Sequence, residues 1–262
     1  MEFEYVVFEE KDNVGYITLN NPENMNPITV SVVEDLIECL NYCEKTNSVR
    51  AIVIRGAGKN FSAGGNVKAM KDKIDNNINE VKYGVRAGGE LIMRLKTISK
   101  PTIAWIEGAV AGVGLSIAMA CDFSIADEKS KFVFAFVNIG YVPDGGLTYL
   151  LTQAIGTVRA SKLVMSGSKI SGAEARELGV ITEAVSAEKL EETVNEYIKR
   201  YSNGLTATYG HIKTLINRTC YSELNACMQN EVEAQYLCSL TKDHKEAVTA
   251  FVEKRKPVFR GL

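Results

Sequence analysis

Two short apolar runs that lead straight into glycine-rich segments constrain the fold most. Residues 51–56 read AIVIRG and continue into the glycine-rich loop 57–66, while residues 102–106 read TIAWI and are followed by Gly108, Gly112 and Gly114. Short runs of β-branched and apolar residues bounded by glycine are typical of buried strands. Amphipathic segments with helical spacing separate these runs. This order predicts an α/β fold.

The rest of the chain continues the alternation and then becomes entirely helical. Strands are expected at 5–9, 14–20, 123–126, 132–136 and 180–185, and helices at 29–46, 67–98, 114–119, 147–155, 158–167 and 171–179, the last with a Ser171–Glu174 capping box. From Glu188 onward the pattern is helical throughout. We therefore expect an α/β core over residues 1–199 and a C-terminal helical segment over residues 200–262.

Composition and charge exclude several classes of function. The 262 residues carry a formal net charge of -2. The chain therefore lacks the excess of positive charge that is typical of proteins that bind nucleic acid or an anionic membrane. No apolar run reaches the length of a membrane span, and the acidic N-terminus does not resemble a signal peptide, so a cytoplasmic protein is expected. Six cysteines without a C-x-x-C pair, together with two histidines, predict free thiols and no metal site.

Two glycine-rich segments are candidates for binding through the backbone. Residues 56–66, GAGKNFSAGGN, lack the spacing of a phosphate-binding P-loop, so they are either a ligand-binding turn or a flexible loop. In residues 106–122, Gly112 and Gly114 flank Val113 at the start of an apolar helix, where free N–H groups could stabilise an oxyanion. The alternative is close helix–strand packing. Ser116 is a poor nucleophile candidate because Ala118 replaces the last glycine of a nucleophile elbow.

Asp144 lies in the stretch NIGYVPDGGLTYLL, residues 138–151, with apolar residues on both sides. Pro-Asp-Gly is a favoured turn combination, so a purely conformational role is one interpretation. The other is that the carboxylate is held there for chemistry.

Taken together, these segments resemble the crotonase (enoyl-CoA hydratase/isomerase) superfamily almost from end to end. The motifs that carry the resemblance are FSAGG (61–65), KPTIAWIEGAVAGVGL (100–115), ACD (120–122), GYVPDGG (140–146), SGAEARELGV (171–180) and AFVEKRKPVF (250–259). The resemblance implies a spiral of β-β-α repeats with a C-terminal helical segment that assembles trimers or dimers of trimers. It also implies acyl-CoA thioesters as substrates, with coenzyme A entering as part of the substrate and no separate cofactor.

The resemblance further assigns roles to individual residues. The backbone N–H groups of Gly65 and Val113 would hold the thioester oxygen. Coenzyme A contacts fall on Asn24, Ala63, Gly64, Gly65, Val67, Phe251 and Lys254, the last two reaching a neighbouring subunit's ligand. The acyl pocket falls on Met70, Gly112, Ser116, Phe136 and Tyr141.

The sequence departs from the family's hydratases at the residues that handle water. The two glutamates that add water across the double bond fall here on Ser116 and Phe136. Asn66 replaces a frequent aspartate, and Asn24 replaces a basic residue in the loop that contacts coenzyme A. Family members with a single carboxylate after this proline include Δ3,Δ2-enoyl-CoA isomerases and ring-expanding phenylacetate-pathway isomerases. We therefore expect an enoyl-CoA isomerase with Asp144 as its general base.

Three alternatives stay open. Two are other reactions of the superfamily: hydration by unusual residues, and hydrolysis or nucleophilic substitution through Asp144. The third is a non-catalytic homologue that binds coenzyme A or acts as a scaffold.

An apolar stripe in the tail bears on assembly. Leu224, Cys227, Met228, Val232, Tyr236 and Leu240 recur at spacings of three and four residues. Such a stripe is too apolar to leave in water. It packs either on the chain's own core or against another subunit, and the family resemblance favours the trimer.

Overall fold

A computed structural model describes residues 3–262. Its strands are β1 (Val6–Lys11), β2 (Val14–Leu19), β3 (Ala51–Gly56), β4 (Thr102–Ile106), β5 (Ala109–Ala111), β6 (Phe123–Asp127), β7 (Lys131–Val133), β8 (Lys169–Ser171) and β9 (Glu183–Val185). Its α-helices are α1 (Val30–Lys45), α2 (Val67–Asp75), α3 (Val81–Thr97), α4 (Val113–Ala120), α5 (Leu147–Ile155), α6 (Thr157–Ser166), α7 (Gly172–Leu178), α8 (Ala187–Ser202), α9 (Thr206–Cys220), α10 (Leu224–Ser239) and α11 (Lys242–Val252). Two 3-10 helices, η1 (Pro22–Asn24) and η2 (Ala135–Ile139), complete the list.

The strands form two sheets whose connections create a spiral. The six-stranded sheet has the order β1-β2-β3-β4-β6-β9, in which only β1 and β2 pair antiparallel. Parallel neighbours require a crossover, and here the chain leaves the sheet after β4 and again after β6. The short strands that follow, β5 and β7, pair with each other in a second sheet that β8 completes. This confirms the predicted α/β spiral.

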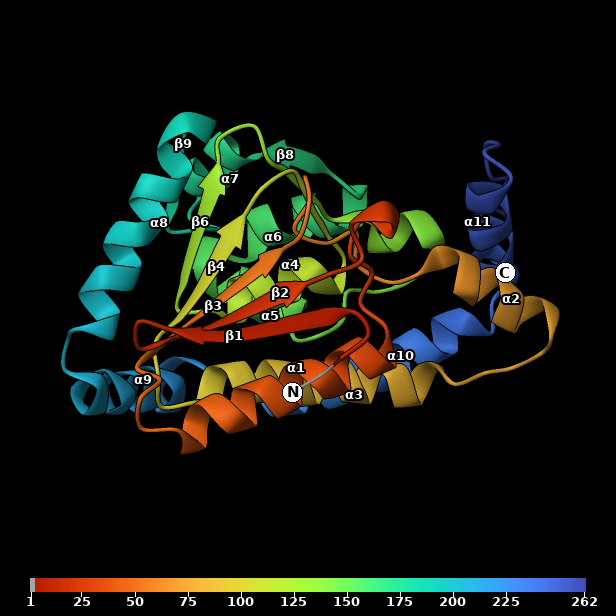
Figure 1. The fold of residues 1–262 in the computed structure, drawn as a ribbon. Helices are drawn as coiled ribbons and strands as arrows, with labels where there is room; N and C mark the ends of the chain where they lie inside the picture. The colour runs from red at the N-terminus through yellow and green to blue at the C-terminus, as the bar shows by residue number, and fades with distance from the viewer. Residues whose placement is uncertain (1–2) are drawn as a thin grey trace.

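Helices cover both faces of the six-stranded sheet. On one face, α8 packs Leu190, Val194 and Ile198 against side chains from four strands, namely Val14, Val53, Ile103 and Ile125. The other face belongs to the main hydrophobic core. Figure 1 shows α1, α3 and α10 running side by side below the sheet, while α11 stands beside α2 at the far end. No helix within residues 3–262 has the length and apolar character needed to cross a membrane.

Local capping signals confirm two predicted helix starts. Thr29 precedes α1, and its Oγ1 accepts a hydrogen bond from the Val32 N–H at 3.3 Å. Ser171 precedes α7 with the reciprocal capping box, because its Oγ accepts from the Glu174 N–H and the Glu174 carboxylate accepts from the Ser171 N–H. Both side chains satisfy amide groups that the first helical turn leaves free.

Several predicted boundaries are wrong. The helical stretch 67–98 is broken into α2 and α3, with Asn77 in the left-handed region at φ 54°. The strand predicted for 132–136 ends at Val133, since the Phe134 N–H bonds to the Ser168 carbonyl and η2 follows. The strand predicted for 180–185 is only Glu183–Val185, and the tail is not helical after Val252. The boundary drawn between residues 199 and 200 falls inside α8.

The apolar stripe of the tail packs mainly on its own chain. Leu224 and Met228 are buried in the main hydrophobic core, Val232 is buried as well, and α10 lies along α3. Leu240, by contrast, is exposed. The stripe is therefore largely unavailable to another subunit, and the expectation that it serves as a subunit contact is corrected.

Candidate active site

Ser62 fixes the loop that carries Gly64 and Gly65. Its buried hydroxyl donates to the Asn26 carbonyl at 2.7 Å and accepts from the Gly64 N–H at 3.0 Å. Gly64 adopts φ +82°, and a Cβ there would lie 2.7 Å from the Ala111 carbonyl oxygen. Only glycine allows this approach between the loop and the end of β5. The loop therefore presents its backbone, not side chains, beside α4.

The start of α4 lies directly against this loop. Gly112 precedes the helix with φ +52°, and a Cβ on it would lie 3.5 Å from Gly64 Cα and 3.9 Å from the Gly65 nitrogen. Val113 is the first helical residue, so its N–H has no partner within the helix. Within residues 3–262, the amides of Gly65 and Val113 donate no hydrogen bond. Two neighbouring free donors, one at the positive end of a helix, suit a developing oxyanion.

The Asp144 turn is tied to the same helix. Gly145 and Gly146 follow the aspartate with φ of +63° and +70°, and α5 begins immediately afterwards. A Cβ on Gly145 would lie 3.0 Å from Ser116 Cβ, and the Ser116 hydroxyl donates to the Asp144 carbonyl at 2.8 Å. Because Ser116 is one turn after Val113 on α4, the helix connects the Val113 amide to the acidic turn.

The Asp144 carboxyl group has one satisfied and one free oxygen. Oδ2 accepts a hydrogen bond from Gln235 Nε2 at 3.0 Å, whereas Oδ1 is buried and has no hydrogen-bond partner within residues 3–262. Burial raises the pKa of Asp144 to about 6, and the hydrogen bond from Gln235 opposes part of that rise. Such a carboxyl is mostly ionised at neutral pH, yet it is basic enough to take a proton.

Helix α10 contributes two buried residues that sequence reasoning missed. Gln235 contacts Asp144 as described, and Glu231 Oε2 accepts from the Gly146 N–H at 2.8 Å. Burial raises the pKa of Glu231 to about 7. Both contacts join segments more than 80 residues apart in sequence, so no local pattern could have revealed them.

Aromatic side chains form the wall beside these groups. Phe136 is buried, and its Cζ would lie 3.9 Å from a Cβ on Gly112. The ring of Tyr141 stacks on His244, with ring centres 4.1 Å apart, and burial raises the pKa of its hydroxyl. His244 is itself fixed by a 2.7 Å contact from Nδ1 to the Ile139 carbonyl oxygen. Phe136 therefore lies beside the start of α4, and the acyl-pocket role expected for Phe136 and Tyr141 stays a prediction.

Two further predicted residues lie at the site, Met70 beside the loop and Ser116 beside the acidic turn. Met70 on α2 approaches Gly65, because a Cβ on that glycine would be 2.7 Å from Met70 Cε. Ser116 is buried, as its role in holding the acidic turn requires. The structure therefore brings together Gly64, Gly65, Met70, Gly112, Val113, Ser116, Phe136 and Asp144.

The residues predicted to contact coenzyme A are less closely grouped. Ala63 donates its N–H to the Met25 carbonyl, and Val67 begins α2 behind the Asn66 cap. Asn24 is exposed, and its Nδ2 donates to Asn21 Oδ1 at 2.9 Å. Phe251 and Lys254 are exposed at the end of α11. Their predicted contact with a neighbouring subunit's ligand stays a prediction.

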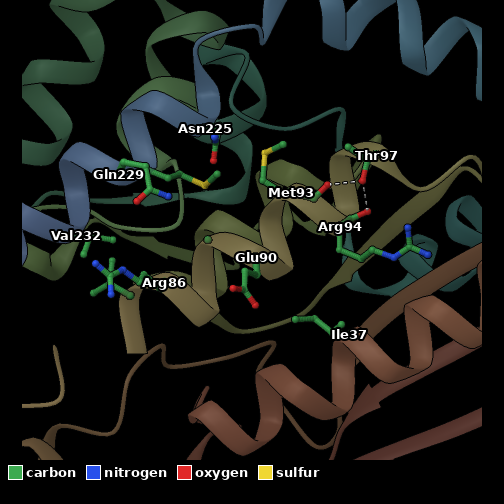
Figure 2. Close-up of a pocket in the computed structure, with 12 residues that line it drawn as sticks. Ile37, Arg86, Glu90, Met93, Arg94, Thr97, Asn225, Gln229 and Val232 are labelled. Atoms are coloured by element: carbon green, nitrogen blue, oxygen red, sulfur yellow. Dashed lines mark hydrogen bonds between the residues drawn. The ribbon is translucent and has the colours of Figure 1, made fainter. Parts of the chain in front are cut away.

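Two surface cavities lie elsewhere. A groove of about 720 Å³ runs between α1, α3 and α10, and Figure 2 shows Arg86, Glu90 and Arg94 on α3 facing it across from Gln229 on α10. A second cavity of about 610 Å³ borders α9 and is lined by Lys213, among others. Neither is lined by Gly65, Val113 or Asp144. Within residues 3–262, no three His, Cys, Asp or Glu side chains are grouped to hold a metal ion.

Three known proteins are similar to this chain over nearly its whole length. A relative from Streptococcus mutans, trans-2-decenoyl-[acyl-carrier-protein] isomerase, is 34% identical over the full length of both chains. The 1,2-epoxyphenylacetyl-CoA isomerase of Escherichia coli is 32% identical over 98% of this chain and 99% of its own. The short-chain-enoyl-CoA hydratase of Clostridium acetobutylicum is 31% identical over 98% and 97%.

A solved structure and a family model give the same answer. The crystal structure of an enoyl-CoA hydratase from Mycobacterium avium superposes with a TM-score of 0.90 at 29% identity, covering 99% of this chain and 100% of that one. The model of the enoyl-CoA hydratase/isomerase family matches residues 9–261. The chain therefore belongs to the enoyl-CoA hydratase/isomerase family, within the crotonase superfamily.

Proposed function

We propose that this enzyme shifts a carbon–carbon double bond in an enoyl thioester, with Asp144 as the only general base. The observation that carries the proposal is the buried Oδ1 of Asp144, which has no hydrogen-bond partner in the described part of the chain, residues 3–262. The two other family positions for carboxylates hold Ser116 and Phe136. One carboxylate is sufficient for isomerisation because the proton that it removes from one carbon can be returned to another.

The chemistry follows from the donors and the base. In a 3-enoyl thioester, Asp144 would take a proton from C2 while negative charge develops on the thioester oxygen. The N–H groups of Gly65 and Val113 would stabilise that charge, each by about 3 kcal/mol. The resulting dienolate can accept the same proton at C4, which places the double bond between C2 and C3. Atoms and charge balance without water or a cofactor.

The side chains at the two former glutamate positions favour isomerisation over hydration. Ser116 is buried and uses its hydroxyl proton on the Asp144 carbonyl, so it does not act as a base. Phe136 is buried and apolar. Neither residue can activate a water molecule for attack on C3, as hydration requires.

The acyl group of the substrate could be carried by coenzyme A or by acyl carrier protein, and two observations support the second carrier. The Streptococcus mutans relative is named for an acyl-carrier-protein thioester, whereas the other relatives are named for coenzyme A. Asn24, where the family often has a basic residue that contacts coenzyme A, is engaged with Asn21. Coenzyme A and acyl carrier protein share the arm that bears the thioester, so the same reaction on a carrier-protein substrate is the alternative.

Product analysis tests the proposal. The enzyme is incubated with 3-enoyl and 2-enoyl thioesters of several chain lengths, each on coenzyme A and on acyl carrier protein, and the products are analysed by mass spectrometry and chromatography. Isomerisation leaves the mass unchanged and shifts the double bond. A gain of one water would indicate hydration, and free coenzyme A or free carrier would indicate hydrolysis; either as the main product overturns the proposal. No turnover of any substrate would favour a binding homologue. The ratio of kcat/KM between the two carriers identifies the physiological one.

A further inference from the structure

Gln235 is buried on α10 and points its amide nitrogen at the acidic turn. Nε2 donates to Asp144 Oδ2 at 3.0 Å and to the Val142 carbonyl at 3.0 Å. The Val142 carbonyl can only accept hydrogen bonds, and the same holds for the Asp144 carboxylate when it is ionised, so the nitrogen and not the oxygen of the amide faces them. The two N–H bonds of the amide are thus fully used on either side of Pro143.

We infer that Gln235 is a positioning residue for the general base, which holds Oδ2 of Asp144 so that Oδ1 alone is left for the substrate. This inference rests on the proposed function and names a residue that acts on the reaction through Asp144. Gln235 itself touches no reacting atom.

Geometry explains why such a residue is needed. The glycines at 145 and 146 give the turn no side chains with which to pack the carboxyl group, and Ser116 holds only its backbone carbonyl. Without Gln235, rotation of the Asp144 side chain about χ1 and χ2 would be limited by contacts alone. A hydrogen bond to one oxygen fixes the rotamer and also stabilises the ionised form.

The other titratable groups around Asp144 are few. Glu231 on α10 faces the same turn from one helical turn earlier, with Cys227 3.8 Å from its Oε1. Tyr141 lies on the turn's own segment and stacks on His244 from α11. The charged residues Arg86, Glu90 and Arg94 of α3 line the separate groove (Figure 2). A pH effect at Asp144 must therefore be separated from Glu231, Tyr141 and His244.

The pH profile of Gln235→Leu tests the inference. The wild-type kcat/KM should rise with pH through about 6, because the base must be ionised and burial raises its pKa to that value. Loss of one hydrogen bond to the ionised group should move this rise upward by about one pH unit. Loss of orientation should lower the high-pH plateau of kcat by about tenfold or more. Gln229→Leu is the matched control, since Gln229 is an exposed glutamine of the same helix that faces the groove.

A second variant, Gln235→Glu, tests the inference independently in case Gln235→Leu does not fold. Gln235→Glu keeps the shape but puts a second carboxyl against Oδ2, and two carboxyls in contact hold one proton between them. The rise of kcat/KM with pH should then occur at a higher pH than in Gln235→Leu. If both variants fold and show the wild-type pH dependence of kcat/KM and the wild-type kcat at high pH, the positioning role of Gln235 is overturned. If Asp144→Asn retains full activity, the proposed function fails instead, so the two failures are distinguishable.

Discussion

The hydroxyl of Ser116 donates to the backbone carbonyl of Asp144 across 2.8 Å, and this bond joins the oxyanion helix to the acidic turn. Val113, whose N–H points out of the helix start, lies one turn before Ser116 on α4. The Val113 amide and the Asp144 turn are therefore held by one short helix whose interior residues are buried. Fixed donors and a fixed base need no rearrangement as charge develops, which is the main source of electrostatic catalysis.

Replacing Asp144 by Asn tests its role as the base. Asn suits the same turn and keeps nearly the same shape, but it cannot accept the proton. Turnover of 3-enoyl thioesters should fall by about two to four orders of magnitude, while binding of substrate persists through the backbone donors. The measurements are kcat from initial rates and Kd from titration calorimetry. An isomerase activity within about threefold of the wild type would show that Asp144 only shapes the turn.

Val113→Pro removes one oxyanion donor and leaves the side chain apolar. Proline is well tolerated at the first position of a helix, where its missing N–H has no helical partner. Loss of this donor should lower kcat by about 100-fold to 1000-fold. Val113→Ile keeps the N–H and enlarges the side chain, so it serves as the control and should retain most activity. Equal kcat values in the two folded variants would exclude the Val113 amide from catalysis.

The fold was largely predictable from the sequence because its signals are local. The Thr29 cap, the Ser171–Glu174 capping box and the glycine turns each depend on residues a few positions apart. The glycine-rich segments around Gly65 and Asp144 could also be identified as candidates from local residues, and their catalytic roles stay predictions. Gln235 and Glu231 were not found, because a buried glutamine or glutamate on a helix looks like any exposed one until the helix is docked. The stripe of α10 was read as a subunit contact for the same reason.

Lys254 should contribute to binding of the nucleotide part of coenzyme A. It is exposed and adopts a left-handed backbone with φ +54°, which asparagine tolerates well. An exposed ion contact is worth up to about 1 kcal/mol, so Lys254→Asn should raise KM for enoyl-CoA by up to about fivefold at low salt, with kcat unchanged. The difference should shrink as salt screens the charge. Lys256→Asn is the control. An unchanged KM at low ionic strength removes Lys254 from the site.

The buried Glu231 should make stability depend on pH. Its folded-state pKa is raised to about 7 from an ordinary value of 4.5, so its contribution to stability is fully present below pH 4.5 and is lost as pH rises through 7. Between pH 5 and pH 8 the melting temperature of the wild type should therefore fall more than that of Glu231→Gln, in which the amide oxygen can still accept from Gly146. The pKa difference of 2.5 limits the effect to about 3 kcal/mol. Calorimetry of both proteins at several pH values measures it, and parallel curves would contradict the raised pKa of Glu231 in the folded state.

Assembly is expected to use α9. With the stripe of α10 mostly buried, α9 and the residue before it still present exposed apolar side chains, namely Leu205, Ile212, Leu215 and Ile216, and Ile212 and Ile216 border the cavity of about 610 Å³. From the family resemblance, we expect other copies of this chain to bury these side chains in a trimer or a dimer of trimers. Light scattering at micromolar concentration should give at least three times the monomer mass. Leu215→Glu together with Ile216→Glu should release monomers, because two buried charges oppose the contact. Val158→Glu, which alters a single exposed valine on α6, is the control and should stay assembled. A wild type that scatters as a monomer would show that these helices have no such partner.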